Sequence, residues 1–151
     1  MIIFIGILFS VAFTVLVGLL CGNLVFFIDL WSLMIIIFPT VFFLWVTKNG
    51  RIFKEYIKSS LTQYHKQSAA ELENTAAAAR STMKIVLAAG FFSFIAGLLN
   101  VLGNLDNPQY LGPNVAVALI SVFYSVSISY FIFFPLQTWA ENKAKNINQK
   151  N

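Results

Sequence analysis

The chain has 151 residues, of which 58% are hydrophobic and only 11% are charged, and its net charge is +4. A soluble domain of this size could not remove so much apolar surface from water, so the composition argues against a water-soluble enzyme and for hydrocarbon as the solvent of most of the chain. The single Cys21 excludes an intramolecular disulfide, and the single His65 has no nearby partners for a histidine metal site, so we expect neither metal nor cofactor.

Residues 1–47 predict a first transmembrane hairpin. The segment 1–20 is apolar apart from one serine, one threonine and two glycines, which is long enough for one helical span. A secretory signal peptide is the rival interpretation, but it needs a basic start and a small-residue cleavage site, and the first residues include neither Lys nor Arg. After a short polar break, residues 30–46 predict a second span, which is slightly short and is completed by Thr47 and its neighbours.

Residues 48–84 predict a short helical cytoplasmic loop. In residues 51–66 the apolar side chains fall on one side of a helix, which suggests a helix against the membrane surface or a neighbouring subunit; a solvated connector is the alternative. Ser68 can cap a further helix with Glu71 at its third position, and the alanine-rich run 71–83 has high helical propensity, so we expect this helix to continue into the third span. The apolar side of the first helix consists of Ile52, Phe53, Tyr56, Ile57, Leu61 and Tyr64.

Residues 85–136 predict an inner hairpin of two further spans, 85–105 and 115–136. The Gly, Asn, Asp and Pro residues between the spans are typical of a turn. Pro113 and Pro135 are expected to shape helix ends, and residues 137–151 to form a cytoplasmic tail. The predicted fold class is therefore an all-α integral membrane protein with four transmembrane helices in two hairpins.

The distribution of charge predicts how these spans are oriented. All ten basic residues lie in 48–84 or after Pro135, whereas the two hairpin turns carry only Asp29 and Asp106. The positive-inside rule then places the middle loop, the tail and both termini in the cytoplasm, and anionic lipids of the inner leaflet attract the same charges. Asp29 and Asp106 are candidates for gathering cations at the outer mouth; solvated helix caps are the alternative.

Each of the last two spans carries a stripe of small and polar residues at spacings of three and four, so the members of a stripe share one helical face. Small residues allow helices to approach closely in lipid, and their polar groups can bond across the contact. The stripes predict either simple helix packing or the lining of a path or socket for something polar. They consist of Gly90, Ser93, Gly97, Asn100 and Asn104 in the third span, and of Asn114, Ala118, Ser121, Ser125 and Ser129 in the fourth.

No span has an ionisable residue near its centre, although intramembrane carboxylates are the usual ion carriers of pumps and transporters. If the protein conducts ions, the titrating group has to come from another chain. The first two spans lack polar stripes, and we expect them to form the lipid-facing outer layer.

Short motifs in both hairpins resemble a known family. In the first hairpin, Phe27-Ile28-Asp29-Leu30-Trp31-Ser32-Leu33 is followed by Pro39-Thr40; in the second, Gly97-Leu98, Asn104-Leu105-Asp106-Asn107-Pro108 and Leu111-Gly112-Pro113 precede Ala116-Val117-Ala118-Leu119, Tyr124 and Phe133-Phe134-Pro135-Leu136. This pattern resembles the MotA branch of the MotA/TolQ/ExbB proton-channel family. The resemblance implies a homopentamer in the bacterial inner membrane, which surrounds a dimer of a single-span partner of the MotB/ExbD type whose membrane Asp carries the ion.

The resemblance also implies an ion path and a partner-helix contact along the two stripes. Sodium-driven relatives tend to place hydroxyls at the positions held here by Phe94 and Val122. Because Ser121 and Ser125 then offer too few oxygen ligands for a dehydrated sodium ion, protons are the favoured ion, with Ser121 as a relay hydroxyl. The residues assigned to this path and contact are Gly90, Ser93, Phe94, Gly97, Asn100, Ala118, Ser121, Val122, Ser125 and Ser129.

The predicted function is that of a stator or energiser subunit of a two-component ion-driven rotary motor, which couples proton flow at the interface with its partner to mechanical work. Such a protein is a transducer and not an enzyme. Because the loop at 48–84 is much shorter than the cytoplasmic domain of flagellar members, no rotor contact is carried over. The alternative is a non-conducting tetraspan scaffold or assembly protein, and a neighbouring gene for a single-span protein with a membrane Asp would distinguish the two.

Overall fold

The computed structural model describes residues 2–20, 22, 29–61, 68–106 and 108–149, and these residues form helices and short turns without a strand. The predicted all-α fold class is confirmed. Three helical segments of this part of the chain are long and apolar enough to cross a membrane, or up to four if the bent pair α2 and α3 is one span. The elements are α1 (Ile2–Leu20), α2 (Leu30–Val46), α3 (Asn49–Leu61), α4 (Ala69–Leu102), α5 (Pro108–Ile128), the π-helical turn η2 (Ser129–Phe133) and α6 (Phe134–Asn148).

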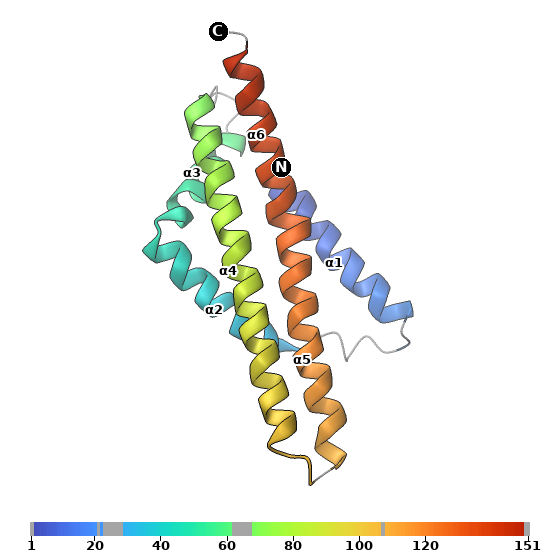
Figure 1. Ribbon diagram of the computed structural model, residues 1–151. Helices are drawn as coiled ribbons and strands as arrows, with labels where there is room; N and C mark the ends of the chain where they lie inside the picture. Colours follow the sequence, from blue (N-terminus) through green and yellow to red (C-terminus); the bar gives the residue numbers. More distant parts are fainter. Residues whose placement is uncertain (1, 21, 23–28, 62–67, 107, 150–151) are drawn as a thin grey trace.

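The centre of the molecule is a long antiparallel pair of helices (Figure 1). α4 is a single helix of 34 residues, and α5, η2 and α6 form one helical run, Pro108–Asn148, beside it. At 1.5 Å per residue α4 is about 51 Å long, whereas the hydrocarbon core of a bilayer is about 30 Å thick. The pair is therefore too long to fit within the bilayer core, and part of it extends beyond.

The helices of the predicted inner hairpin run past the limits expected from the sequence. The limits at 84/85 and 136/137 both fall inside helices, so residues 137–148 are helical. α4 begins behind a capping box, in which Ser68 Oγ accepts the Glu71 N–H at 3.2 Å and the Glu71 carboxylate accepts the Ser68 N–H at 3.0 Å. This cap and the alanine-rich run that follows explain why one helix continues from the loop into the third span, as the sequence predicted.

Alanines hold the two long helices together beyond the predicted spans. Leu72 and Ala76 of α4 form a buried cluster with Ala140 and Ala144 of α6. Short side chains at these positions let the two backbones approach closely. The segment expected to be a tail is thus packed along the first half of α4.

The two prolines of the fourth span differ in their surroundings. The expectation of a helix end at Pro113 is wrong, because α5 already begins at Pro108 and Pro113 lies inside it. Pro135 lies in the first turn of α6, directly after η2, where the Phe134 N–H donates to the carbonyl of Ser129. In a regular α-helix a proline ring collides with the carbonyl four residues earlier, and a wider π turn just before the proline relieves that collision.

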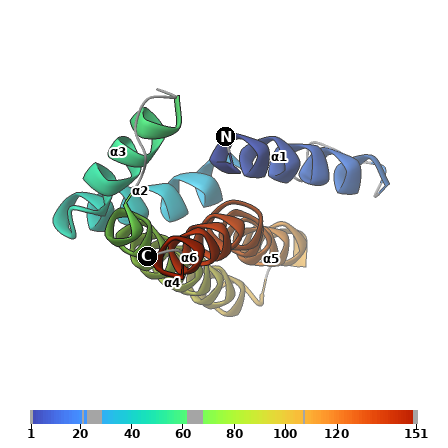
Figure 2. The same cartoon turned by 90° about the horizontal axis from the view of Figure 1, so that it is seen from above.

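α1, α2 and α3 lie on one side of the long pair (Figure 2). α1 packs on η2, whereas α2 packs on α4 and α5, where Ile36 joins Val86 and Ile120 in a buried cluster. The remaining sides of α1 and α2 expose large apolar side chains, among them Trp31 and Phe38. Such surfaces are suited to contact with lipid.

The chain turns by 89° between α2 and α3. α2 ends at Val46 with Thr47 as its C-cap, so the residues that follow do not lengthen the second span, contrary to the prediction. At the turn Asn49 Nδ2 donates to Ser81 Oγ of α4 at 2.8 Å, which ties the bend to the long pair.

α3 is the amphipathic helix that the sequence predicted, but its apolar side has a different partner. Phe53 and Tyr56 are buried with Ala78 and Ala79 of α4 and with Leu136, in contact with the chain's own bundle rather than with a membrane surface or a neighbouring subunit. The small alanines of α4 leave room for the two rings, which explains the difference. The predicted contribution of Tyr64 lies outside the described residues.

Lys48, at the bend, has a φ of 59°, in the left-handed region where a side chain is unfavourable. We expect Lys48→Gly to raise the free energy of unfolding by about 1 kcal/mol, because glycine adopts this conformation without strain. The same change at Lys54, inside α3, is the matched control and is expected to lower it by about 1 kcal/mol. Thermal unfolding in detergent, followed by circular dichroism, compares the two, and a destabilised Lys48→Gly variant would contradict the strained bend.

Candidate functional site

The two predicted stripes face each other across the contact between α4 and α5. A Cβ atom on Gly90 would lie 2.1 Å from Oγ of Ser125, and a Cβ atom on Gly97 would lie 2.6 Å from Cβ of Ala118. Both distances are far below van der Waals contact, so the observed spacing of the helices requires glycine at both positions. The structure thus brings the stripes together as a close helix contact, in agreement with the helix-packing interpretation.

The serine hydroxyls of the fourth span are buried in this contact. Ser121 and Ser125, with exposed fractions of 0% and 2%, each donate to a carbonyl three residues earlier on α5, at 2.8 and 2.9 Å. Ser129 Oγ, also buried, donates across the pair to the carbonyl of Met83 at 3.4 Å. Each hydroxyl therefore uses its proton within the chain, and the proposed role of these residues on an ion path stays a prediction.

The stripes end in a cluster of amides beside the hairpin turn. Asn100 Nδ2 donates to Asn114 Oδ1 at 3.3 Å, and Asn104 Nδ2 donates to the carbonyl and side-chain oxygens of Asn100 at 2.8 and 3.1 Å. The first bond joins α4 to α5 at the end of the pair, and the other two join the turn to α4.

The other predicted path residues differ in exposure. Ser93 is buried with the stripes, whereas Phe94 and Val122 are half-buried and Asn100 is exposed. No single surface of this chain therefore presents the whole predicted set.

Bulky apolar side chains stay exposed on both helices of the inner pair. Phe91 and Ile95 on α4, and Leu119 and Val126 on α5, are exposed, while α1 to α3 cover the pair from one side only (Figure 2). Sequence reasoning directed attention to the polar stripes and missed these exposed side chains. The available signal was the run of bulky apolar residues on the helical faces opposite the stripes.

The two acids predicted at an outer mouth do not lie together. Asp29 is the N-cap of α2, its carboxylate accepts from the Trp31 N–H and from Ser32 Oγ, and its own N–H donates to the hydroxyl of Tyr124 at 3.1 Å. Tyr124 lies 16 residues along α5 from Pro108, about 24 Å of helix from the turn that holds Asp106.

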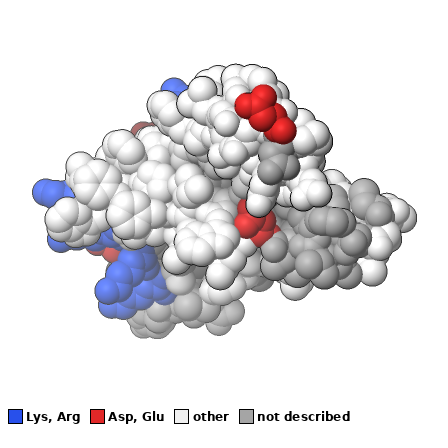
Figure 3. Space-filling view, turned by 90° about the horizontal axis from the view of Figure 1, so that it is seen from below, with Lys and Arg blue, Asp and Glu red and all other residues white. Residues whose placement is uncertain are grey.

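Figure 3 shows the acidic side chains of this end in two separate places, with the Lys and Arg side chains gathered away at one side. Asp29 is half-buried and Asp106 is exposed. The capping alternative describes Asp29, and one chain does not bring the two acids to a single mouth. Their attraction of cations stays a prediction.

The contact between α1 and η2 was not foreseen from the sequence. A Cβ atom on Gly6 would lie 2.3 Å from the carbonyl oxygen of Phe131 and 3.0 Å from Cα of Ile132. Beside this point, the rings of Phe9 and Phe13 lie 5.0 and 5.1 Å from the ring of Phe131 in edge-on contacts. A glycine within a bulky apolar helix was the signal that could have located the contact.

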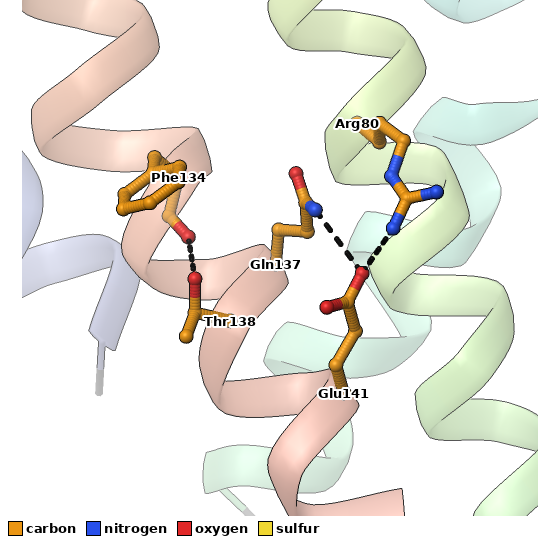
Figure 4. A network of polar contacts seen from close by, with 5 residues as sticks. All are labelled: Arg80, Phe134, Gln137, Thr138 and Glu141. Atoms are coloured by element: carbon orange, nitrogen blue, oxygen red, sulfur yellow. Dashed lines mark hydrogen bonds and ion pairs between the residues drawn. The ribbon is translucent and has the colours of Figure 1, made fainter.

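A polar network joins α4 to α6 towards the end of the long pair that lies away from the hairpin turn (Figure 4). Arg80 of α4 forms an ion pair with Oε1 of Glu141 on α6, and Gln137 Nε2 donates to the same oxygen at 3.1 Å. The hydrogen bond from Gln137, opposed by desolvation and assisted by the Arg80 guanidinium, holds the pKa of Glu141 below its usual value. The network fixes the position of α6 against α4 outside the apolar part of the pair.

Within the described parts of the chain, no group of three His, Cys, Asp or Glu side chains is placed to hold a metal ion. The two long helices instead form an apolar hairpin, with most members of the two polar stripes buried in the contact between α4 and α5. Such a surface can pack against further helices in lipid.

Comparison with known proteins agrees with this architecture. Residues 43–151, more than two thirds of the chain, match the MotA/TolQ/ExbB proton channel family. The chain is 39% identical over 49 residues to the chemotaxis protein PomA of Vibrio alginolyticus, covering 32% of this chain and 19% of PomA. It is 34% identical over 57 residues to the uncharacterized protein YtxD of Bacillus subtilis, covering 38% of this chain and 21% of YtxD. The matched segments span about a fifth of the length of each relative.

Proposed function

The chain belongs to the MotA/TolQ/ExbB proton channel family, and from this premise we propose that it is the stator or energiser subunit of a two-component ion-driven rotary motor. The observation that supports the proposal most is the extent of the match, which includes α3 and both helices of the inner pair. The similarity to PomA favours the MotA-like branch. The chain acts as a mechanical transducer in the inner membrane, with both termini in the cytoplasm, and not as an enzyme.

The proposed assembly is a homopentamer around a dimer of a single-span MotB/ExbD-like protein. The sequence supplies no carboxylate in residues 85–102 or 108–128, so the partner's membrane Asp carries the ion. The exposed apolar side chains, Phe91 and Ile95 on α4 and Leu119 and Val126 on α5, are suited to packing against neighbouring copies and the partner helices. We infer that these side chains share the partner contact that the sequence assigned to the polar stripes, because most members of the stripes are buried between α4 and α5.

Protons are the proposed ion. A dehydrated sodium ion needs several oxygen ligands at once, whereas a proton needs a carboxylate and a relay group. Ser121 and Ser125 are buried in the contact between α4 and α5, and Phe94 and Val122 contribute no oxygen. This arrangement supports a proton more than a sodium ion.

The experiment is co-purification with a single-span protein that carries a membrane Asp and is encoded nearby. The chain and the partner are expected to form a complex of five and two copies by mass measurement in detergent. Cells expressing the complex are expected to take up protons with sodium absent from the medium. Uptake that requires sodium and survives a protonophore would overturn the ion assignment.

A non-conducting tetraspan scaffold is the second candidate, because most members of the stripes are buried where α4 packs against α5. It predicts a complex of another stoichiometry, or a complex whose partner Asp can be replaced by Asn without effect. In the motor, the same Asp→Asn change in the partner abolishes ion uptake.

A further inference from the structure

The outer side of α3 carries a row of cations. Arg51, Lys54 and Lys58 are three and four residues apart, so they share one face of the helix, and Lys48 precedes them at the bend. All four side chains are exposed, and Glu55 is the one acid between residues 48 and 58. These four cations are called the basic face of α3 below.

The opposite side of α3 is fixed on the chain's own bundle. Phe53 and Tyr56 are 9% and 5% exposed, and their rings lie 5.8 Å from the ring of Phe133 and 5.7 Å from that of Trp139. α3 cannot turn its apolar side towards lipid without breaking these contacts. Unlike a helix that inserts its apolar side into a membrane, α3 therefore presents its cations.

The basic face begins just beyond the end of an apolar helix. α2 ends at Val46, and Trp45, which is 79% exposed, is of the residue type that marks the level of lipid headgroups. Lys48 follows three residues after Trp45, and Arg51 and Lys54 follow within the next two helical turns, about 9 Å of rise. Long Lys and Arg side chains reach a headgroup layer from such positions.

The cations nearest the bend lack an acidic partner in the described part of the chain. Among the described residues, the ion pair is the one between Arg80 and Glu141. Lys48, Arg51 and Lys54 therefore have no carboxylate within pairing distance in this part of the chain. Each cation beside an anionic membrane surface strengthens association by about fivefold. The charges of Lys48, Arg51 and Lys54 are therefore available to an external anion.

We propose that the basic face of α3 binds the headgroups of anionic phospholipids in the leaflet that α3 adjoins. The site rests on α3, the bend and the end of α2, and it requires a membrane-embedded chain but no ion conduction. Failure of the proposed motor function therefore leaves this proposal standing, and the reverse also holds.

The test measures phospholipid binding to the purified full-length chain. Delipidated protein in detergent is titrated with phosphatidylglycerol or phosphatidylcholine, and bound lipids are counted by native mass spectrometry. We expect a preference for phosphatidylglycerol that falls by about 25-fold in Arg51→Gln/Lys54→Gln, since two cations are lost. Inorganic phosphate at the same concentration is expected to bind no better to the unaltered chain than to this variant.

Two further variants make the result specific. Lys143→Gln/Lys145→Gln removes the same net charge from α6, and its lipid preference is expected to stay within about twofold of that of the unaltered chain. Arg51→Lys/Lys54→Arg keeps the charge and is expected to keep the preference, which separates charge from misfolding. The proposal would be overturned by equal losses of lipid preference in the α3 and α6 double variants, or by no loss in either. It would also be overturned if the cations of α3 bound an acidic soluble protein and no anionic lipid.

Discussion

A leucine at position 90 is expected to keep α4 and α5 from packing. Already the Cβ atom would lie 2.1 Å from Oγ and 2.3 Å from Cβ of Ser125, and 3.2 Å from the carbonyl oxygen of Ser121. The helices have to separate, and the buried contact between the two stripes is lost. We therefore expect a loss of about 3 kcal/mol or more in the free energy of unfolding. The measurement is thermal unfolding in detergent by circular dichroism, together with the yield of folded protein.

Gly112→Leu is the matched control, because nothing lies within 4 Å of a Cβ atom at position 112. This variant is expected to differ little from the unaltered chain. A compensating pair gives a sharper test: Gly90→Ala alone is expected to destabilise, and adding Ser125→Gly removes both colliding side-chain atoms and restores stability. Additive losses in the double variant would show that Gly90 does not face Ser125.

A leucine at position 6 is expected to displace α1 from the long pair. The Cβ atom would collide with the carbonyl oxygen of Phe131 at 2.3 Å, and a backbone atom within a helical run cannot move aside as a flexible side chain can. We expect α1 to lose its contact with η2, at a cost of about 1–3 kcal/mol.

Thiol cross-linking measures this displacement. Cysteines replace Phe9 and Phe131, whose rings lie 5.0 Å apart, in a Cys21→Ser background. A short bifunctional reagent is expected to join them in the parent and to fail with Gly6→Leu. Ala12→Leu, an exposed position on the same helix, is expected to leave the cross-link intact. Efficient cross-linking of the Gly6→Leu variant would show that α1 does not depend on this close approach.

Features set by local chemistry could be predicted from the sequence. The capping box of Ser68 and Glu71, the alanine-rich continuation and the turn after Gly103 follow from neighbouring residues, and the structure contains all three. The spacing of the stripes also predicted shared faces. What spacing alone could not decide was which surface each face meets, because a small polar stripe satisfies its polar groups equally well on a sister helix or on a partner.

Features set by contacts between distant segments could not be predicted. The burial of Phe53 and Tyr56 on α4 depends on how the segments pack in three dimensions. The same holds for the position of Asp29 beside Tyr124. Gly6 and Pro135 each gave a local signal, but the sequence does not show that both lie beside the π turn η2. The extent of α6 was missed because charged residues after Pro135 read as a solvated tail, although its alanines at 140 and 144 are spaced for a helix contact.

The unequal construction of the two long helices has a mechanical consequence. α4 is an unbroken α-helix, whereas its neighbour contains a π turn of five residues directly before Pro135. A sideways force on the far end of the pair is expected to tilt α4 as a stiff rod and to bend the neighbouring helix first at the π turn, where the regular hydrogen-bond ladder is interrupted. A tilt of about 10° over the roughly 25 Å between that turn and the end of α6 moves the end by about 4 Å. The compliance of the hairpin is thus concentrated at one level, which is also the level at which α1 is attached.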